Sequence, residues 1–410
     1  MAKEYKDLVF GLDIGTAKVM VVAAEVLPEG ELRLAGLGVA PTHGLKRGVV
    51  VNIDATVQSI QQALKEAEMM DACKITSVYT GITGSHIRGQ NSTGMVIVRD
   101  NREVTPVDVS RVVETAKAIN IPGDQRLLLV EPQEFVIDGH EVKEPIGMSG
   151  SRLEVKVHIV TGAQSAAENI VKCVRRCGLE VERLVLNPSA SSAAVLTDDE
   201  KSLGVALVDI GAGTTDVQIY TEGSVRHTAV IPIAGDLITS DIAMALRTPT
   251  KDAEEIKVEH GVAKQLLADP SQQVEVPGLG DRSPRMLSRQ ALAGVIEPRV
   301  EEIFALVHQI IRESGYEEVL SSGIVLTGGS SVMPGMVELG EDIFLKPVRR
   351  GLPTYRGPLS DMVASPRSAT VMGLLEEARL ARARGIKAAA QVGSVKTVLG
   401  RAKDWLLGNF

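Results

Sequence analysis

The sequence contains very few aromatic residues: they make up 3% of its 410 residues, and one alone is a tryptophan. Proteins that hold single-stranded nucleic acid stack its bases on aromatic side chains, so this class of function is not expected. The chain also lacks a surplus of positive charge, since its net charge is −8. General nucleic-acid binders are basic because their affinity comes from contacts with phosphate. We therefore expect no nucleic-acid partner.

Cysteines are equally scarce, and long apolar runs are missing. Cys73, Cys173 and Cys177 form no CxxC pair, and no histidine joins a cluster with ligand spacing, which favours buried free thiols in a reducing cytosol. The opening residues, MAKEYKDLVF, lack the charged, apolar and cleavage regions of a signal peptide. No apolar run approaches the roughly 20 residues that span a bilayer. The sequence therefore predicts a cytoplasmic body.

Positive charge is concentrated at the C-terminal end. Residues 379–410 contain seven basic residues and a single acidic one, Asp404, so the rest of the chain is strongly acidic. The final stretch, VGSVKTVLGRAKDWLLGNF, places its apolar residues on one helical face with cations beside it. Such a helix lies on an anionic membrane surface, with the cations reaching lipid phosphates. The alternative is a terminal helix packed on its own domain. The predicted membrane residues are Val395, Lys396, Leu399, Arg401, Lys403, Trp405, Leu406 and Phe410.

One device occurs twice in the chain. LVFGLDIGTAKVMVVAAEV and GVALVDIGAGTTDVQIY each read as a strand, an Asp-x-Gly turn and a second strand, 196 positions apart. A glycine-rich turn lets backbone N–H groups approach phosphate oxygens without obstruction by a Cβ atom. Lys18 adds a point charge on phosphate. The expected donors in the two turns are Gly15, Thr16, Ala17, Gly211, Gly213, Thr214 and Thr215.

An aspartate stands at the strand end of each turn, Asp13 in the first and Asp209 in the second. Two carboxylates facing one gap suit Mg²⁺, which keeps several waters and sits on nucleotide phosphates. We take both as metal residues that act through water, and Asp209 as the candidate catalytic residue that organises metal and attacking water. Two hairpins that clamp one triphosphate need two similar half-domains, which explains the repetition. The alternative is a pair of unrelated structural hairpins.

Other residues are candidates for the base, the ribose and the floor of the cleft. Glu254 and Lys257 share one face of a predicted helix and reach toward ribose and base, unless they are a solvated charge pair. Asn187 and Pro188 lie where the cleft floor is expected, or only cap the following helix. The stretch GIVLTGGSSVMPG is a buried strand that ends in a Gly-Gly turn.

Residues 85–161 form a small α+β unit without a phosphate loop. Thr105 and Pro106 are typical of a helix start, the first as N-cap and the second at the first helical position. RLLLVEPQEFVID and SRLEVKVHIVTG read as strands. His158 falls on the polar face of the second of these and is expected to be a solvated residue rather than a ligand. We predict an inserted subdomain here.

With these stretches in place, the chain resembles the actin-like ATPase superfamily, and more narrowly, over residues 8–410, the FtsA family of bacterial division proteins. The stretches that carry the narrower resemblance are GLDIGTAKV, SVYTGITGSHI, TAKAINIP, PQEFVIDG, VKVHIVTG, RHTAVIPIAGDLITSDIA, PRMLSRQALAGVIEPR and GIVLTGGSSVMPG. The resemblance implies bound ATP with Mg²⁺, head-to-tail protofilaments and a location on the cytoplasmic face of the inner membrane at the division septum. The ATP residues it adds are Gly235, Gly328, Gly329, Ser330 and Met333.

The same resemblance implies partners. The C-terminal peptide of the tubulin-like division protein FtsZ would bind at Arg285, Arg299 and Glu302, which by sequence alone are a charged helix face. Later division proteins would bind the inserted subdomain, and the C-terminal helix would target the membrane.

The fold class that follows is α/β: an actin-like ATPase fold with two duplicated lobes around a nucleotide cleft, an inserted α+β subdomain and a C-terminal amphipathic helix. The first lobe comprises 1–84, 162–200 and a closing helix in 358–384, with the insertion at 85–161. The second lobe comprises the hairpin in 201–232, a small helical, partner-docking subdomain in 233–300 and the Gly-Gly turn in 301–357. A linker, 385–391, leads to the membrane helix, 392–410.

The leading hypothesis is a division protein that polymerises at the membrane, tethers FtsZ filaments there and helps recruit later division proteins. Its ATPase activity is expected to be slow at most. Two alternatives stay open: a small-molecule kinase of the same superfamily, and an actin-like adaptor of pilus assembly.

Overall fold

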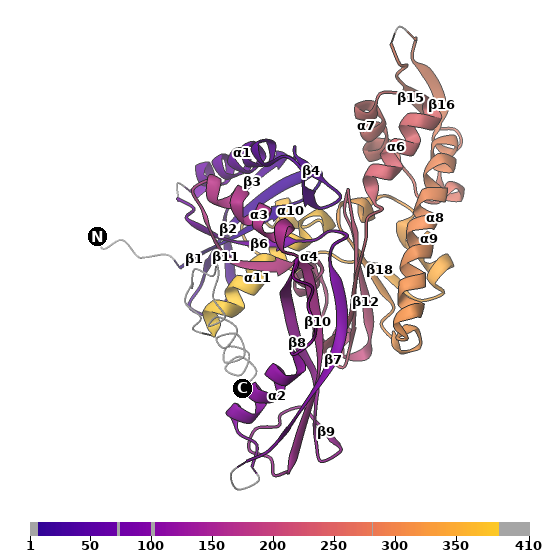
Figure 1. Ribbon diagram of the computed structural model, residues 1–410. Helices are drawn as coiled ribbons and strands as arrows, with labels where there is room; N and C mark the ends of the chain where they lie inside the picture. The colour runs from indigo at the N-terminus through magenta and orange to yellow at the C-terminus, as the bar shows by residue number, and fades with distance from the viewer. Residues whose placement is uncertain (1–6, 72–73, 100–102, 281, 385–410) are drawn as a thin grey trace.

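Two five-stranded sheets lie side by side at the centre of the computed structural model, which describes residues 7–71, 74–99, 103–280 and 282–384 (Figure 1). The first sheet belongs to the lobe that opens the chain. It consists, in chain order, of β1 (Leu8–Ile14), β2 (Lys18–Val26), β3 (Leu32–Pro41), β6 (Ser77–Ile82) and β11 (Glu180–Leu186). The other elements of this lobe are α1 (Ile53–Asp71), α3 (Gln164–Arg176), α4 (Asn187–Val195), α11 (Ala369–Ala383) and the short hairpin β4 (Leu45–Lys46) and β5 (Val49–Val50).

The second sheet repeats the first strand for strand. It consists of β12 (Val205–Ile210), β13 (Thr215–Thr221), β14 (Ser224–Ile231), β17 (Ile324–Thr327) and β18 (Val348–Arg350). Its order, β18-β17-β12-β13-β14, matches β11-β6-β1-β2-β3, with the same parallel and antiparallel pairs. The prediction of two duplicated α/β lobes is confirmed, and each Asp-x-Gly turn joins the first two strands of its sheet.

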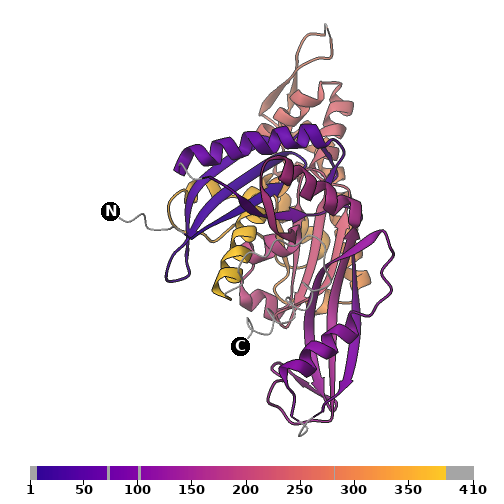
Figure 2. The same ribbon diagram turned by 60° about the vertical axis from the view of Figure 1, so that its left-hand side comes forward.

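Helices and short strands complete the second lobe. Figure 2 shows α6, α7 and the start of α8 extending away from the sheets, opposite to the inserted subdomain. The elements are α5 (Asp198–Leu203), α6 (Gly235–Leu246), α7 (Thr250–His260), β15 (Gln273–Val276), β16 (Arg285–Ser288), α8 (Arg289–Ser314) and α9 (Met336–Phe344), while the short helix α10 (Ser360–Val363) packs on the first lobe. Four 3₁₀ turns, η1 (Gln265–Leu267), η2 (Glu317–Val319), η3 (Gly329–Val332) and η4 (Pro366–Ser368), connect them.

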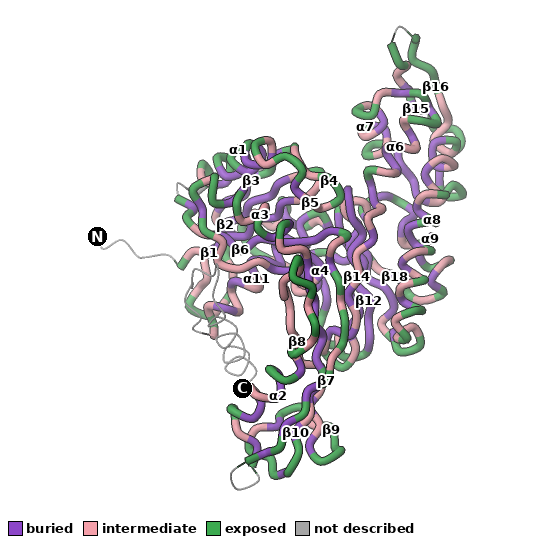
Figure 3. Tube along the Cα trace, viewed as in Figure 1, coloured by how far each residue is buried: buried purple, intermediate pink, exposed green. Residues whose placement is uncertain are grey.

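The strands at the centre are apolar on both faces because helices or neighbouring elements cover both faces. β12 is buried at every position, and β1 at six of its seven. Figure 3 shows this burial running through both sheets, while exposed residues gather at the outer ends of the molecule. Strands covered on both sides read as continuous apolar runs rather than alternating ones. Asp13 and Asp209 are therefore exceptions that stand at the ends of otherwise apolar strands.

The inserted subdomain has a hydrophobic core of its own. It contains β7 (Arg88–Ile97), α2 (Pro106–Ala116), β8 (Gln125–Ile137), β9 (His140–Val142) and β10 (Arg152–Ala163), in the sheet order β7-β10-β8-β9. Val112 of α2 packs with Leu153 and Val155 of β10 in this core. Thr105 caps α2 with its side chain, and Pro106 occupies the first turn, as predicted.

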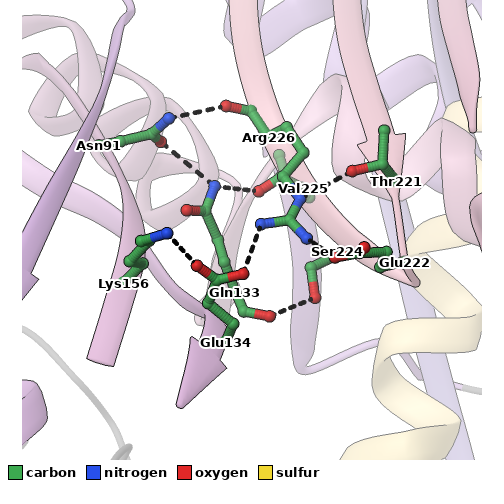
Figure 4. Close-up of polar contacts among 9 residues, drawn as sticks. All are labelled: Asn91, Gln133, Glu134, Lys156, Thr221, Glu222, Ser224, Val225 and Arg226. Atoms are coloured by element: carbon green, nitrogen blue, oxygen red, sulfur yellow. Dashed lines mark hydrogen bonds and ion pairs between the residues drawn. The ribbon is translucent and has the colours of Figure 1, made fainter. Parts of the chain in front are cut away.

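This subdomain emerges from the first lobe but lies against β14 of the second, and polar groups make the contact (Figure 4). Asn91 donates to the carbonyl of Arg226 at 3.1 Å, and Gln133 donates to the carbonyl of Val225 at 2.7 Å. The guanidinium of Arg226 lies 3.8 Å from Glu134 of β8 and also pairs with Glu222. The subdomain thus bridges both lobes through hydrogen bonds, beside an apolar cluster in which Val160 of β10 and Val230 of β14 take part.

His158 is part of this bridge, and the expectation that it is solvated is wrong: only 1% of it is exposed. Burial lowers the pKa of His158 to about 4, with a smaller contribution from the charge of His227, so the ring is neutral near pH 7. Its Nδ1 lies 2.7 Å from Asn91 Oδ1, and its Nε2 lies 2.9 Å from the Thr228 hydroxyl of β14. The amide oxygen of Asn91 only accepts, so Nδ1 carries the proton and Nε2 accepts from Thr228.

We expect His158→Phe to lower the free energy of unfolding by about 2 kcal/mol, since two buried hydrogen bonds of about 1 kcal/mol each are lost. His140→Phe is the matched control, because His140 is exposed on β9 of the same subdomain. Urea unfolding of the two variants measures the difference. Equal destabilisation by both variants would contradict the bridging role of His158.

Several predictions concern residues outside the described part of the chain. The linker 385–391, the membrane helix 392–410 and Cys73 all lie there. Of the other two cysteines, Cys173 is buried and Cys177 partly buried, and both are free thiols. Within the described residues, no helix is both long and apolar enough to cross a bilayer.

Candidate functional site

The two Asp-x-Gly turns close in the same way. The amide of Gly15 donates to the carbonyl of Lys18 at 2.9 Å, and the amide of Gly211 donates to the carbonyl of Thr214, also at 2.9 Å. Between the last paired residues of the strands, each turn carries four residues, 15–18 in the first and 211–214 in the second. The repeated Asp-x-Gly sequence therefore adopts the same backbone conformation in both turns.

The tips of the two turns touch each other. A Cβ atom on Gly213 would lie 2.5 Å from the hydroxyl oxygen of Thr16 and 2.9 Å from the Cα atom of Arg47, so only glycine fits. The same hydroxyl accepts a hydrogen bond from the amide of Gly48 at 3.1 Å. Thr214 is buried beside this contact, while the hydroxyl of Thr215 donates to the carbonyl of Ile233 instead. We call the place where both tips meet the hairpin site.

Asp13 and Asp209 are both buried at the hairpin site. Burial raises the pKa of Asp13 to about 6. The positive charge of Lys18 lowers this pKa in part, and the negative charge of Asp209 raises it by a smaller amount. Burial also raises the pKa of Asp209, while hydrogen bonds from Ser191 and Thr370 and the charge of Lys18 oppose the rise. Lys18 compensates these two desolvated carboxylates only in part, because their pKa values remain raised, and a divalent cation would supply the remaining positive charge.

Three side chains or backbone groups fix the position of Asp209. The Ser191 hydroxyl of α4 donates to its Oδ2 at 2.5 Å, and the Thr370 hydroxyl of α11 lies 3.5 Å from the same atom. Gly328 approaches its Oδ1 so closely that a Cβ atom there would lie 2.3 Å away. Asp209 of the second lobe is thus held by helices of the first.

Lys18 is the cation at the first hairpin. Its ammonium group donates to the carbonyl of Arg367, far away in the sequence, and lies 3.2 Å from the sulfur of Met20. Burial lowers the pKa of Lys18, and Asp13 partly restores it. The position suits contact with an anion that enters beside Asp13, as predicted for phosphate.

The Gly-Gly turn reaches the second hairpin through its backbone. Gly328 has a φ of 84°, which favours glycine, and it ends β17 directly beside Asp209. The Ser330 hydroxyl donates to the carbonyl of Gly211 at 2.8 Å, and the amide of Gly235 donates to the same oxygen at 3.2 Å. Met333 packs 3.3 Å from the position a Cβ atom of Gly261 would take at the end of α7. The structure therefore gathers Gly235, Gly328, Ser330 and Met333 around the second hairpin and α7.

Glu254 and Lys257 of α7 make contacts with α6 in addition to their own ion pair of 2.6 Å. Lys257 donates to the carbonyl of Gly235 at 3.1 Å and to the Thr239 hydroxyl at 2.8 Å, and Thr239 also donates to Glu254. Glu254 stays about half exposed. The pair thus braces α7 against the start of α6, next to Gly235.

The predicted partner residues lie along α6. Two guanidinium nitrogens of Arg299 in α8 donate hydrogen bonds to the carboxylate of Asp241, at 2.5 and 3.0 Å. Arg299 also forms an ion pair with Glu302, one turn away. Arg285 of β16 donates to the carbonyl of Leu246 at 2.7 Å. Both arginines therefore border the same helix, about one and a half turns apart along it.

Asn187 does not cap α4, because that helix has no side-chain cap. Its amide packs on the first lobe's sheet instead, where a Cβ atom on Gly81 would lie 2.2 Å from its Oδ1. This oxygen is buried without a hydrogen-bond partner within the described part of the chain.

The motifs did not reveal several residues of the site. Asp216 is the cross-strand partner of Asp209, and its pKa is raised to about 8 by burial and by the charge of Asp209. Thr83, from the first lobe, donates to its Oδ1, and Thr214 donates to its Oδ2 at 3.3 Å. A signal was available, since Asp216 is the second acidic residue of the DIGAGTTD turn. Ser191, Thr370 and Arg367 carry no such signal.

The donor set fits a magnesium-bound nucleotide. The two glycine turns offer backbone amides other than those of Gly15 and Gly211, which already donate within their turns, and Lys18 supplies a cation that compensates the two buried aspartates only in part. No group of three or more histidine, cysteine, aspartate or glutamate side chains within the described residues has the arrangement of a metal site. A Mg²⁺ ion that arrives with phosphate and keeps its waters needs only one or two carboxylates.

Comparison with known families gives two matches. Residues 206–373 match the family model described as "Cell division protein FtsA", and residues 84–161 match the model of the "SHS2 domain inserted in FTSA". The chain is 53% identical to cell division protein FtsA of Pseudomonas aeruginosa over 410 residues, which cover 98% of each chain. It is 43% identical to that of Escherichia coli strain K12 over 415 aligned residues, which cover 99% of each.

Two solved structures with this fold are more distant from this chain in sequence. The chain is similar to a chain of the PilM–PilN type IV pilus biogenesis complex, with a TM-score of 0.65 and 18% identity over 92% of this chain and 98% of that one. It is also similar to MreB5 of Spiroplasma citri bound to ADP, with a TM-score of 0.56 and 15% identity over 93% and 99%. At such identities the likeness shows the actin-like fold alone.

Proposed function

Since the chain belongs to the FtsA family of cell-division proteins, we propose that it is a membrane tether of the division machinery. It binds ATP with Mg²⁺ between its lobes, polymerises on the cytoplasmic face of the inner membrane at the septum and holds FtsZ filaments there. It also helps recruit later division proteins through the inserted subdomain. Family membership favours this role over the kinase and pilus-adaptor alternatives.

The observation that carries the ATP-binding part is the pair of touching glycine turns with a buried aspartate at the mouth of each. Backbone amides of both turns, Lys18 and Thr16 hold phosphate, and Gly328, Gly329 and Ser330 lie beside the adenosine end. Asp13 and Asp209 would hold Mg²⁺ through its waters, and the metal would neutralise negative charge at the phosphates.

Asp209 is the residue best placed to organise attacking water. Ser191, Thr370 and the backbone at Gly328 hold its carboxylate rigidly, so it can accept a hydrogen bond in one orientation only. The carboxylates beside it are Asp13, which is assigned to the metal, and Asp216, whose pKa of about 8 keeps it mostly protonated near pH 7, so neither is a free general base. We therefore propose slow hydrolysis at most.

Support for self-assembly comes from the fold. A MamK double helical filament has a similar chain, with a TM-score of 0.50 and 12% identity. The inserted subdomain and the helical end of the second lobe extend in opposite directions (Figure 2), so contacts between them would join copies head to tail. Nucleotide that holds the lobes together would favour one subunit shape and hence these contacts.

The tether is tested by one reconstitution. The full chain, mixed with anionic liposomes and a fluorescent FtsZ C-terminal peptide, is expected to bring the peptide down with the vesicles. A chain ending at Ala390 should bind the peptide but leave it in solution. The reason is that this chain lacks residues 392–410, the proposed amphipathic membrane helix. Arg299→Ala should sediment with the vesicles yet bind the peptide at least about tenfold more weakly, since a charged hydrogen-bonding group is removed.

Arg312→Ala is the matched control for Arg299, because Arg312 is an exposed arginine in the last turn of the same helix, α8. It should behave as the unmodified chain does. Sedimentation of the shortened chain with the vesicles would contradict the membrane role. Full peptide binding by Arg299→Ala would contradict the placement of the FtsZ site.

A further inference from the structure

Arg367 lies where the chain returns from the second lobe to the first, in η4 (Pro366–Ser368). Two contacts fix the backbone here. The carbonyl of Arg367 accepts from the ammonium group of Lys18, and the carbonyl of Pro366 accepts from the amide of Gly328 at 3.2 Å. η4 therefore ties the first hairpin to the Gly-Gly turn.

The side chain of Arg367 stands over the Gly-Gly turn. Its Cγ atom lies 3.8 Å from the position a Cβ atom of Gly329 would take, and nothing else comes as near to that position. The residue is exposed. The aliphatic part of the Arg367 side chain thus passes across the Gly-Gly turn, which has no side chain at Gly329 to separate the two.

The charge of Arg367 has no anionic partner within the described part of the chain, since no carboxylate there lies within ion-pair distance of its guanidinium group. It is close enough to Lys18 for its charge to lower the pKa of that residue, after the larger effects of burial and Asp13. Two like charges held side by side repel each other, so this arrangement is favoured by an anion between them.

We propose that Arg367 binds the phosphate chain of the nucleotide as a second cation beside Lys18. The proposal rests on the nucleotide binding proposed above and names one more residue of that site. Phosphates at the hairpin site and adenosine at the Gly-Gly turn must be joined by a chain that passes between Lys18 and Gly329, and Arg367 borders both. Its planar guanidinium offers paired donors that match phosphate oxygens better than a lysine does.

The test is a competition assay with the full chain. A fluorescent ATP analogue is displaced by ATP, ADP or adenosine, in the presence of Mg²⁺. In Arg367→Gln we expect ATP and ADP to bind about tenfold more weakly, which is the effect of losing a charge-assisted hydrogen bond at an exposed site. Adenosine should bind as it does to the unmodified chain. Arg367→Lys should recover part of the loss, and raising the salt concentration should shrink the difference between the variants.

Arg356→Gln is the matched control: Arg356 is exposed in the same returning segment, next to Tyr355, whose hydroxyl accepts from the amide of Leu34 in β3. It should leave all three affinities unchanged. Equal ADP affinities in Arg367→Gln and the unmodified chain would overturn the proposal. So would an equal loss for adenosine, which would assign Arg367 to the base instead. Failure of the unmodified chain to bind any nucleotide would refute the proposed function itself.

Discussion

Replacing both Asp13 and Asp209 by asparagine is expected to weaken binding of ATP in the presence of Mg²⁺ by at least about a hundredfold. Each carboxylate contributes a charged acceptor to the waters around the metal, and a charge-assisted hydrogen bond is worth roughly 1.5–3 kcal/mol. The two losses together correspond to two or more powers of ten. Isothermal titration with ATP, once with Mg²⁺ and once with EDTA, measures the effect.

The EDTA arm separates metal binding from misfolding. Without metal, the variant that carries both Asp13→Asn and Asp209→Asn should bind ATP at least as well as the unmodified chain. The reason is that it lacks two negative charges near the phosphates. Asp124→Asn is the control, since Asp124 is exposed in the inserted subdomain. An Asp13→Asn, Asp209→Asn variant that kept its affinity with Mg²⁺ would contradict the assignment of the hairpin site, and the proposed ATP-dependent function with it.

Without nucleotide, the protein is expected to lose stability as the pH rises from about 4 to about 8. Asp216 has a pKa of about 8 in the folded chain against 3.8 for an unperturbed aspartate, and Asp13 has one of about 6. The folded state therefore binds more protons than the unfolded state across this range. Stability that depends on these protons is complete below pH 4 and lost as the pH passes each raised pKa.

The size of this effect is several kcal/mol, because each pKa difference of one unit corresponds to about 1.4 kcal/mol. Asp216→Asn should remove the largest single part of the slope, while Asp13 and the buried Glu131 keep their own raised pKa values. Asparagine resembles the protonated acid in shape, and its oxygen still accepts from Thr83. Urea unfolding at pH 5, 7 and 9 measures the slope, with Asp124→Asn as control. Parallel pH profiles for Asp216→Asn and the unmodified chain would contradict the buried, proton-binding role of Asp216.

Predictions of local structure from the sequence succeed where neighbours along the chain decide the outcome. The strand, Asp-x-Gly turn and strand at Asp13 and at Asp209 both appear as predicted, because an apolar run and a glycine turn are sufficient to specify them. Thr105 and Pro106 start α2 for the same reason. The duplication of the lobes follows from the repetition of this strand, Asp-x-Gly turn and strand pattern.

Predictions about exposure and partners fail where a distant segment covers a surface. Alternation along β10 assigns His158 to the face opposite Val157 and Ile159, but whether that face is covered depends on β14, about 70 residues later. Likewise, Asp216 obtains its hydrogen bond from Thr83 across the two lobes. No local pattern contains this information.

The sequence by itself determined the two hairpins, the duplicated lobes, the inserted subdomain and the residues that each glycine turn presents. Only the tertiary structure decided which groups meet those turns from elsewhere: the side chains of Ser191 and Thr370 at Asp209, that of Thr83 at Asp216 and the backbone carbonyl of Arg367 at Lys18. The physical reason is the distance along the chain over which each kind of interaction acts. Turn and strand preferences act over a few bonds, whereas desolvation and hydrogen bonding of a buried charge depend on whatever the folded chain places within about 3 Å of it.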